Sequence, residues 1–411
     1  MIIKQQIKDF EKLGFGMFVH FGLYSMLERG EWVLNLGDCS REEYYSLKDS
    51  FCPEPDWAEN LVDTAKAAGC KYITLTTRHH DGFSLYDTCG LNDLDAPHSS
   101  AKRDLVREFV NACNAKGIVP FFYHTLLDWY VNSYNSDFKE YLKYLRKSVE
   151  LLCKNYGKIG GIWFDGMWNK PDADWEEDAL YQMIRSYQPD AMIINNTGLD
   201  NRGALGHIEL DSVTFERGRP SPINLKDSPK YIASEMCQTF ATHWGYAAKD
   251  FKYKSLGEII EDFCCCRKYG SNFLLNVGPK GNGYLSCLDE AMLVTLGEWV
   301  KLQQEALYLP RPEQIKITGR SPKDFMLRNG GVYYLFCHDA NTTGDCNVVI
   351  GTDDNKDFSD CFVFEKKVKR ITWLDNDENV DFEQNGDTVK ILPFSYKYGT
   401  NLVVRVAKIE T

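Results

Sequence analysis

The stretch GGIWFDG, residues 160–166, is a short unbroken apolar run that ends in a carboxylate and a glycine. Such runs are typical of strands in a parallel sheet, which helices and the sheet interior bury on both faces. Seven further runs of this kind precede residue 310: 15–22, 72–80, 119–127, 191–196, 211–216, 234–239 and 272–278. Amphipathic stretches with helical spacing lie between several of them, at 56–69, 102–117 and 137–157. Eight β-type runs that alternate with helices predict an α/β fold, a (β/α)8-like barrel of the TIM type.

The predicted barrel is irregular, and a second domain follows it. The segment after the sixth run has no clear helical pattern, so we expect an incomplete ring of helices. After a last helix around 288–307, short alternating runs broken by Asn, Asp and Gly replace the earlier pattern. These runs are 332–337, 346–350, 361–365, 388–394 and 401–406. They predict a small C-terminal antiparallel β-sandwich at 313–411, after a catalytic barrel domain at 1–312.

Composition and charge restrict the class of protein. The chain has 411 residues, of which 44% are hydrophobic and 26% charged, as in ordinary globular proteins. A net charge of -12 without a Lys/Arg run argues against a nucleic-acid partner, and no apolar stretch is long enough to predict a membrane partner. The first sixteen residues lack the apolar core of a signal peptide, so we expect a cytoplasmic protein, or a secreted one if a signal was trimmed. The 14 cysteines form no zinc-ribbon pairs and are expected to be reduced.

Polar residues follow most of the predicted strands, where the active sites of barrels lie. They are His20, Arg78, His79, His80, Asp81, His124, Asp128, Asp165, Asn195, Asn196, Glu216, Glu235 and Asn276. Tryptophans are interleaved with them. Sugars present hydroxyls for hydrogen bonds and apolar C–H faces for stacking, so carboxylates, imidazoles, amides and indoles together predict a sugar pocket.

Asp165 is the candidate nucleophile of this pocket. It leaves an apolar strand just before Gly166, which permits a sharp turn. A retaining glycosidase needs a second carboxyl group about 5 Å away that serves as acid and then as base. Glu216 and Glu235 are both candidates, because both follow apolar residues whose burial would raise a carboxyl pKa. For any one of these carboxylates, a helix cap or an ion pair is the competing role.

His79 and His80 are adjacent, so in a regular strand they would face opposite sides. That arrangement makes a shared metal ion awkward. We therefore interpret both as hydrogen-bonding partners for sugar hydroxyls, and we expect no metal or organic cofactor.

Several motifs together resemble the alpha-L-fucosidases of glycoside hydrolase family 29. They are residues 16–22, 30–32, 76–83, 163–166, 243–246 and 272–279, which spread over nearly all of the first 280 residues. The resemblance implies a retaining exo-glycosidase that removes terminal alpha-L-fucose from oligosaccharides or glycoconjugates through a fucosyl ester on Asp165. It implies no cofactor. In the family pattern Glu216 matches the usual acid/base position, and Glu235 is the less favoured candidate.

The resemblance also implies a fucose subsite. Its residues would be Phe18, His20, Glu31, Trp32, His79, His80, Tyr123, Trp163 and Trp244. Phe18 and Trp244 are placed to cover the C6 methyl group, and such an apolar wall would leave a C6 hydroxyl unpaired. One departure concerns an arginine that contacts the sugar in the family, because this chain has Thr197 at the matching place. Two alternatives follow: either Arg202 supplies the contact with the sugar, or this contact is absent.

Other functions are compatible with parts of the pattern. An exo-galactosidase on the same scaffold would prefer a sugar with a C6 hydroxyl. A catalytically silent fucose-binding protein would keep the pocket without the paired carboxylates. A metal-dependent hydrolase is disfavoured because the chain lacks the His-x-His pair often seen in such barrels. The cleaved linkage, the acceptor sugar and the oligomeric state do not follow from the sequence.

Overall fold

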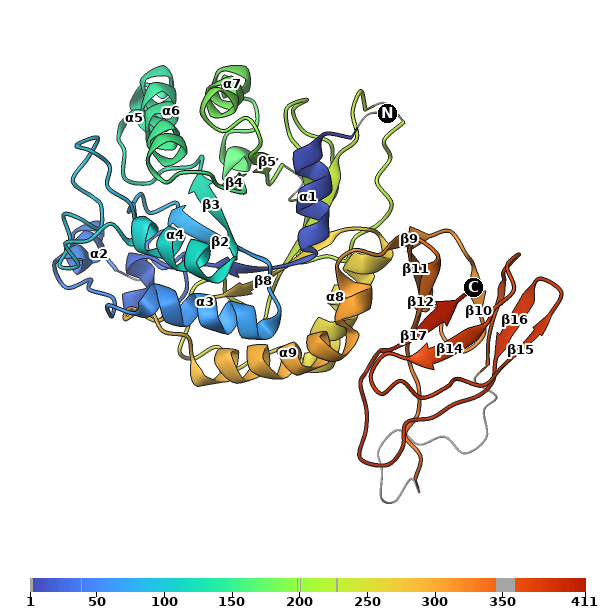
Figure 1. Cartoon of the computed structure of the whole chain (residues 1–411). Helices are drawn as coiled ribbons and strands as arrows, with labels where there is room; N and C mark the ends of the chain where they lie inside the picture. The colour runs from blue at the N-terminus through green and yellow to red at the C-terminus, as the bar shows by residue number, and fades with distance from the viewer. Residues whose placement is uncertain (1–2, 38, 198, 200, 227, 345–358) are drawn as a thin grey trace. The chain divides into compact units, whose positions relative to one another are not determined.

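Figure 1 shows a computed structural model of the chain, which describes residues 3–37, 39–197, 199, 201–226, 228–344 and 359–411. The chain separates into two compact units. The first comprises Met1–Lys254 with Ser271–Val294, and the second comprises Ser255–Gly270 with Thr295–Thr411.

The first unit contains a closed barrel of eight parallel strands. They are β1 (Phe15–Val19), β2 (Tyr72–Arg78), β3 (Val119–Thr125), β4 (Gly161–Asp165), β5 (Met192–Asn195), β6 (Ser212–Glu216), β7 (Ala233–Thr239) and β8 (Asn272–Val277). Each strand pairs with the next, and β8 pairs with β1 to close the sheet. The predicted barrel is confirmed, and every strand falls on one of the eight apolar runs.

Helices connect most of these strands (Figure 1). They are α1 (Gln5–Leu13), α2 (Arg41–Ser46), α3 (Trp57–Ala68), α4 (Leu105–Lys116), α5 (Ser133–Ser136), α6 (Phe138–Asn155), α7 (Glu177–Tyr187), α8 (Leu256–Lys268) and α9 (Cys287–Leu307), with short 3-10 turns at Leu23–Met26, Leu47–Asp49 and Met167–Asn169. The second unit takes in α8 and the later part of α9. The boundary between residues 312 and 313 stays a prediction.

The amino-terminal end of the barrel is closed by α1. The Phe10 ring of this helix lies 5.7 Å from the Tyr72 ring and 5.8 Å from the Phe121 ring, and both partners stand near the starts of their strands. Ile7 joins the same buried cluster. The opposite end of the barrel is therefore the one left for a site.

The ring of helices is incomplete, as predicted. The described residues between β6 and β7 form no helix, and those between β5 and β6 form none either. Pro220 and Pro222 lack the backbone N–H that a helix interior requires. Gly203 adopts a positive φ of 78°, which also interrupts a helix. Both connections therefore reach the barrel rim as irregular loops.

The second unit contains two antiparallel sheets, which confirms the predicted sandwich. One has the order β10-β13-β16-β15 and the other the order β14-β17-β12-β11-β9. Their bounds are β9 (Arg311–Glu313), β10 (Ile317–Thr318), β11 (Phe325–Asn329), β12 (Val332–Cys337), β13 (Asp360–Val363), β14 (Arg370–Trp373), β15 (Phe382–Asn385), β16 (Thr388–Ile391) and β17 (Arg405–Glu410). The predicted run 346–350 lies outside the described residues.

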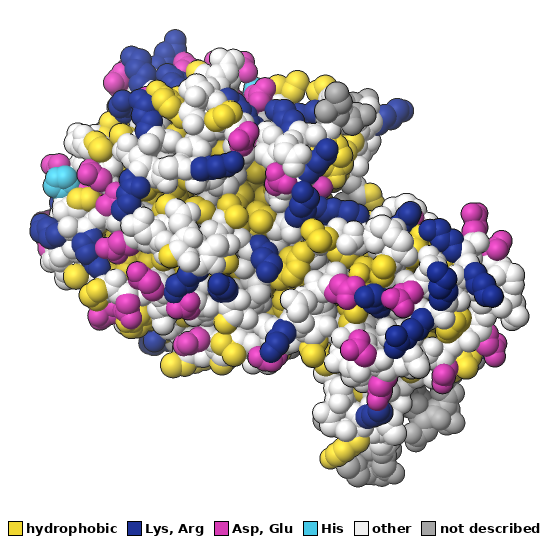
Figure 2. All heavy atoms as spheres, viewed as in Figure 1, with side chains coloured by type: hydrophobic (Ala, Val, Ile, Leu, Met, Phe, Trp, Pro, Cys, Tyr) yellow, Lys and Arg dark blue, Asp and Glu magenta, His cyan; other side chains and the backbone are white. Residues whose placement is uncertain are grey.

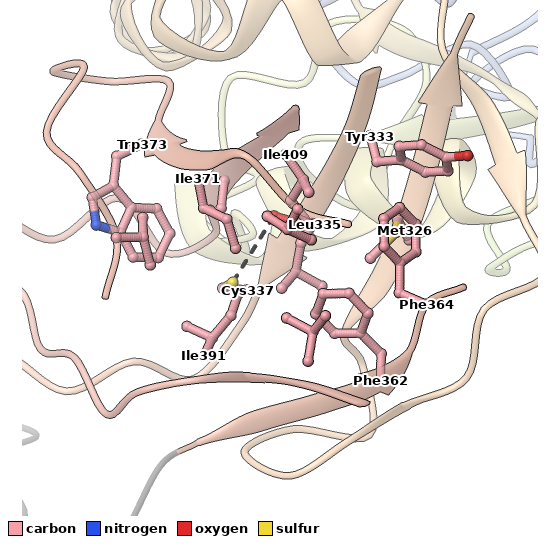
Figure 3. Packing of buried hydrophobic residues seen from close by; sticks show 14 residues of the cluster. Met326, Tyr333, Leu335, Cys337, Phe362, Phe364, Ile371, Trp373, Ile391 and Ile409 are labelled. Carbon is pink, nitrogen blue, oxygen red and sulfur yellow. Dashed lines mark hydrogen bonds between the residues drawn. The ribbon is translucent and has the colours of Figure 1, made fainter. Parts of the chain in front are cut away.

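Apolar side chains from both sheets form the core of the sandwich (Figure 3). Leu335 and Ile409 come from one sheet, and Phe362 and Ile391 come from the other. All four are at most 2% exposed. Buried and more exposed residues alternate along β13 and β16, as the sequence pattern predicted, whereas five consecutive residues of β12 are buried.

The surface charges, the cysteines and the helices restrict the class of protein further. Figure 2 shows acidic and basic side chains interspersed over the visible face of the barrel unit, so this face has no continuous basic patch. The described cysteines are all free thiols. Among the helices that the structure describes, none combines the length and apolar character needed to cross a bilayer.

Candidate active site

A cavity of about 100 Å³ opens at the carboxyl ends of the barrel strands. Its lining consists of Phe18, His20, Trp32, His79, His80, Tyr123, Trp163, Asp165, Trp168, Leu199, Glu216, Cys237 and Trp244. Most of the predicted site residues therefore meet in one place. The cavity is smaller than the roughly 300–1,000 Å³ of sites for drug-sized ligands. It fits a single sugar ring rather than an extended chain.

Asp165 is the last residue of β4 and projects into this cavity. Tyr123 Oη donates to Asp165 Oδ2 at 3.1 Å, and Trp168 Nε1 donates to Oδ1 at 3.2 Å. His80 Nε2 lies 3.6 Å from Oδ2. The turn after Asp165 needs glycine, because Gly166 has a φ of 99° and a Cβ there would lie 2.7 Å from Leu127 Cβ. These contacts fix the direction of the Asp165 carboxylate.

Glu216, the last residue of β6, stands close to Asp165. Asn196 Nδ2 donates to Asp165 Oδ1 at 3.3 Å and to Glu216 Oε2 at 2.7 Å. Because both distances start at the same nitrogen, these two oxygens are separated by about 6 Å at most. This bound on one pair of oxygens is compatible with the about 5–5.5 Å between the carboxyl groups of retaining glycosidases. Thr214 Oγ1 donates to Asn196 Oδ1 at 2.9 Å and orients the amide.

The surroundings of Glu216 favour its protonated form. Burial and the negative charge of Asp165 together raise the pKa of Glu216 to about 7, against the opposing effects of the hydrogen bond from Asn196 and of the Arg217 and Arg202 charges. A carboxyl group with a pKa near 7 holds a proton at neutral pH and releases it easily. This is the electrostatic requirement for a general acid.

Glu235 occupies a different environment. It lies within β7 rather than at its end, and it does not line the cavity. Its two oxygens accept hydrogen bonds from Tyr72 Oη at 2.5 Å and from Trp163 Nε1 at 3.0 Å. Burial raises the pKa of Glu235 to about 7 as well. Glu235 therefore stabilises the barrel interior behind Trp163, and the geometry brings Glu216, not Glu235, next to Asp165.

His79 and His80 both line the cavity despite being adjacent. The pairing register shifts between Thr76 and Arg78, and β2 ends at Arg78, so the two histidines lie beyond the regular strand. Their rings are 4.2 Å apart. The end of the strand thus removes the alternation that would send the two rings to opposite faces.

Burial favours the neutral form of His20 and His79. Burial lowers the pKa of His20 to about 3, and burial followed by the charges of His80 and His20 holds the pKa of His79 well below its usual value. His20 Nδ1 is 2.6 Å from Asn276 Oδ1, and His80 Nδ1 is 2.7 Å from Thr125 Oγ1. These contacts use the Nδ1 atom of each ring, so the Nε2 atom can interact with a second partner. Neutral imidazoles of this kind suit sugar hydroxyls.

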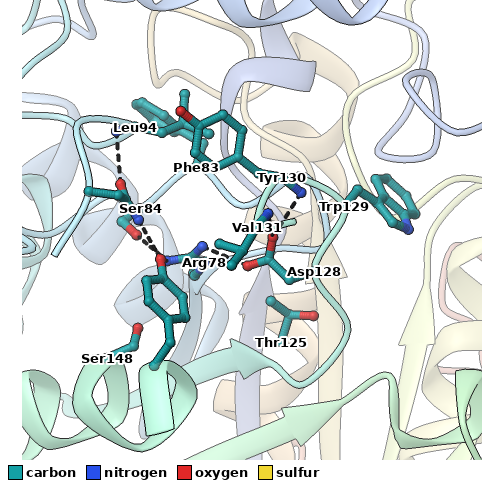
Figure 4. A network of polar contacts seen from close by, with 12 residues as sticks. Arg78, Phe83, Ser84, Leu94, Thr125, Asp128, Trp129, Tyr130, Val131 and Ser148 are labelled. Atoms are coloured by element: carbon teal, nitrogen blue, oxygen red, sulfur yellow. Dashed lines mark hydrogen bonds and ion pairs between the residues drawn. The ribbon is translucent and has the colours of Figure 1, made fainter. Parts of the chain in front are cut away.

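A buried ion pair holds the end of β2 against the loop after β3 (Figure 4). Arg78 Nη2 lies 2.6 Å from Asp128 Oδ2, with the two side chains 0% and 1% exposed. Asp128 Oδ1 also accepts the backbone N–H groups of Tyr130 and Val131, both at 2.8 Å. Trp129 N donates to the His80 carbonyl at 2.8 Å, which ties the loop to the histidine segment.

Glu31 does not line the cavity. Its Oε2 accepts the backbone N–H groups of Trp244 at 3.1 Å and Gly245 at 2.8 Å. Glu31 therefore positions Trp244, whose ring lies 5.9 Å from that of Phe18. Phe18 and Trp244 form an apolar part of the pocket wall.

Arg202 lies outside the lining of the cavity, and its Nε donates to the backbone carbonyl of Glu216 at 2.6 Å. The lining includes three residues that the sequence did not single out, namely Trp168, Leu199 and Cys237. Cys237 follows Glu235 at a spacing of two in β7, so strand alternation was the available signal. Within the described ranges, no group of three His, Cys, Asp or Glu side chains is arranged to hold a metal ion.

A closed parallel barrel that presents two neighbouring carboxylates in a sugar-sized pocket defines a glycoside hydrolase. The sequence model of one family, Alpha-L-fucosidase, matches residues 3–305. The chain belongs to the alpha-L-fucosidase family.

Individual proteins agree with this placement. Tissue alpha-L-fucosidase of Mus musculus is 29% identical over 364 residues, which cover 80% of this chain and 77% of the relative. The structure of alpha-L-fucosidase isoenzyme 1 from Paenibacillus thiaminolyticus has a TM-score of 0.81 and 26% identity, and the match covers 99% of this chain and 98% of that one.

A further structure is that of an alpha-L-fucosidase from Bacteroides thetaiotaomicron, a trapped covalent intermediate in complex with 2-fluoro-fucosyl fluoride. Its TM-score is 0.81 at 21% identity, over 100% of this chain and 96% of that one, and this likeness shows a shared fold. Together with the family match, the comparisons confirm the expected family and the barrel followed by a sandwich. They also confirm the expected class of enzyme, a hydrolase of alpha-L-fucosides.

Proposed function

We propose that Asp165 and Glu216 carry out the hydrolysis of a terminal alpha-L-fucoside by double displacement. The observation that carries this proposal is the Asn196 side chain, which contacts both carboxylates and limits their separation. The raised pKa of Glu216 supports the assignment of this residue as the acid.

In the first step, the Asp165 carboxylate attacks the anomeric carbon while Glu216 gives its proton to the glycosidic oxygen. The glycosidic bond breaks, and a fucosyl ester of Asp165 forms. In the second step, Glu216 takes a proton from water as the water oxygen attacks the same carbon, and the ester bond breaks. Two inversions leave the configuration of the sugar unchanged. The intermediate trapped in the Bacteroides thetaiotaomicron fucosidase supports this route.

The substrate we propose is a fucosylated oligosaccharide or glycoconjugate with fucose at its end. A cavity of about 100 Å³ takes one ring, so the enzyme acts on the terminal residue. Neutral His20 and His79 suit the ring hydroxyls, and the wall of Phe18 and Trp244 suits the C6 methyl group. No organic or metal cofactor enters either step.

Replacement of the nucleophile tests the proposal. We expect Asp165→Gly to lower turnover of an aryl alpha-L-fucoside by at least about a thousandfold, and added azide to restore reaction with glycosyl azide as the product. The control is Asp174→Asn, because Asp174 is exposed and accepts the Glu176 N–H at 2.9 Å through an oxygen that asparagine keeps. Unchanged turnover by Asp165→Gly would overturn the assignment. A wild-type protein that binds fucose in calorimetry without turnover over hours would indicate a binding protein instead.

A further inference from the structure

Two arginines flank Glu216 at the mouth of the pocket. Arg202 Nε donates to the Glu216 carbonyl at 2.6 Å. Arg217 is the next residue after Glu216, and its guanidinium carbon lies 4.7 Å from the centre of the Trp244 ring. Both arginines are exposed, and both are among the charges that act on the Glu216 carboxyl group. Two guanidinium groups therefore stand beside the proposed general acid.

Neither guanidinium contacts a carboxylate in the part of the chain that the structure describes. Arg202 donates to a backbone carbonyl, and Arg217 donates to the Thr242 carbonyl at 2.6 Å and covers an aromatic ring. Several other arginines of the barrel unit pair with a carboxylate. Arg78, Arg146 and Arg185 pair with Asp128, Glu176 and Asp211, respectively. In a chain with a net charge of -12, two guanidinium groups that pair with none of the described carboxylates attract an anion locally.

The position of these arginines corresponds to the side where the leaving group departs. In double displacement the leaving group lies next to the general acid and opposite the nucleophile. The acceptor sugar released by the first step must therefore lie by Glu216. Arg217 is held there by its backbone, because its φ of 48° is left-handed and its N–H donates to the Cys237 carbonyl at 2.9 Å. The backbone at Arg217 is therefore fixed, and this restricts where its guanidinium group can lie.

We propose that Arg202 and Arg217 bind an anionic group on the acceptor sugar, a sulfate ester or a carboxylate. Guanidinium groups match the oxygens of such anions with charge-assisted hydrogen bonds. The favoured substrate is then an acidic fucosylated oligosaccharide. This inference rests on the proposed role of Glu216 as the acid, since that role fixes where the acceptor lies.

The test uses three substrates that share one fucosylated trisaccharide. One is neutral, one carries a sulfate ester on the acceptor sugar, and one carries a carboxylate there. We expect wild-type kcat/KM at about 20 mM salt to favour at least one anionic substrate about tenfold, and about 200 mM salt to reduce the preference because it screens exposed charges. Arg202→Gln and Arg217→Gln should each weaken the preference, and the double variant should remove it. The two anionic substrates distinguish sulfate from carboxylate.

Arg41→Gln is the matched control. Arg41 also donates to a backbone carbonyl, that of Trp129 at 2.7 Å, and also covers a ring, that of Tyr45 at 5.4 Å. It does so at the loop after β3, three strands around the barrel from β6, so the preference should persist in this variant. Because all three substrates share the fucosyl group, their ratio cancels any change in the acidity of Glu216.

Two results would overturn the inference. One is a wild-type enzyme that hydrolyses the neutral trisaccharide as well as both anionic ones at low salt. The other is a preference that survives in the double variant. Failure to hydrolyse even a neutral aryl alpha-L-fucoside would instead overturn the proposed function, so the two failures are distinguishable.

Discussion

Asn196 is the residue on which the chemistry of the two carboxylates depends. Its amide nitrogen contacts Asp165 and Glu216, and its oxygen accepts the Thr214 hydroxyl. Its hydrogen bond favours the charged form of Glu216, whereas burial and the charge of Asp165 favour the protonated form. The balance leaves Glu216 with a pKa of about 7. The acidity of Glu216 is thus set by burial and by neighbouring groups that act in opposite directions.

This balance predicts the pH dependence of activity. Because Glu216 must be protonated to assist the leaving group, kcat/KM should fall as pH rises through about 7. Asn196→Ala removes a hydrogen bond to the charged form of Glu216, so the pKa of Glu216 rises. The falling limb of the pH profile, where kcat/KM decreases with rising pH, should therefore move to higher pH. We expect kcat/KM at the optimum to drop about 10- to 100-fold.

The control for this profile is Asn195→Ala. Asn195 is equally buried, but its amide donates to Tyr181 Oη at 3.1 Å, so its loss should not move the limb. A limb that stays in place in Asn196→Ala, or moves to lower pH, would contradict the proposed role of Glu216.

The wall of Phe18 and Trp244 predicts how the enzyme selects its sugar. An aryl alpha-L-galactoside differs from the fucoside by a C6 hydroxyl, which this wall would leave unpaired at a cost of about 1–3 kcal/mol. Parallel measurements of kcat/KM should therefore favour the fucoside at least about fivefold. Equal or better turnover of the C6-hydroxylated sugar would indicate the exo-galactosidase alternative.

At the scale of elements, the end of β2 decides where two pocket residues lie. The register shift before Arg78 and the ion pair between Arg78 and Asp128 hold the histidine segment against the loop after β3. The charges are fully buried, so the pair is sensitive to the loss of one partner. This anchoring positions His79 and His80, which directly follow Arg78 in the chain.

We expect Asp128→Asn to lower the free energy of unfolding by about 3–5 kcal/mol, because it leaves the Arg78 charge buried without a counter-charge. Guanidinium unfolding followed by tryptophan fluorescence measures this change. Asp137→Asn serves as the control, since Asp137 caps α6 through the Glu140 N–H and asparagine caps equally well. A cost below about 1 kcal/mol for Asp128→Asn would contradict the importance of the pair.

Strands were predictable from the sequence because burial on both faces leaves unbroken apolar runs. The strand pattern alone did not distinguish Glu216 from Glu235, because both lie beside apolar residues, and only the family resemblance favoured Glu216. Glu216 ends β6, whereas β7 continues to Thr239 and keeps Glu235 inside the barrel. The two glutamates differ in their place relative to a strand end, and sequence patterns place such ends poorly.

Other features depended on tertiary contacts rather than on local pattern. Trp168 enters the pocket through a short 3-10 turn after β4, and no periodicity marks such a turn. Glu31 was assigned to the sugar because of its motif, and the structure uses it to hold Trp244. The roles of the site residues in catalysis stay predictions until the variants are measured.

At the scale of the whole molecule, the proposed mechanism requires only the side chains of the protein and no bound metal ion. Dialysis against a chelator should therefore leave kcat within about twofold of its starting value, because neither proposed step uses a Lewis acid. The measurement is kcat before dialysis, after it, and after addition of zinc. Activity that is lost on dialysis and restored by zinc would revive the metal-dependent alternative.

The closure of the barrel by β1 and β8 determines when the site can exist during synthesis. His20 Nδ1 meets Asn276 Oδ1 across 256 residues of chain, and β1 has no partner on that side until β8 has left the ribosome. At roughly 5–20 residues per second, the interval is on the order of 10–50 s. During that time the nascent sheet has open edges that can pair with other chains. Protection from aggregation during translation is thus a requirement that the barrel's own topology places on the cell that makes it.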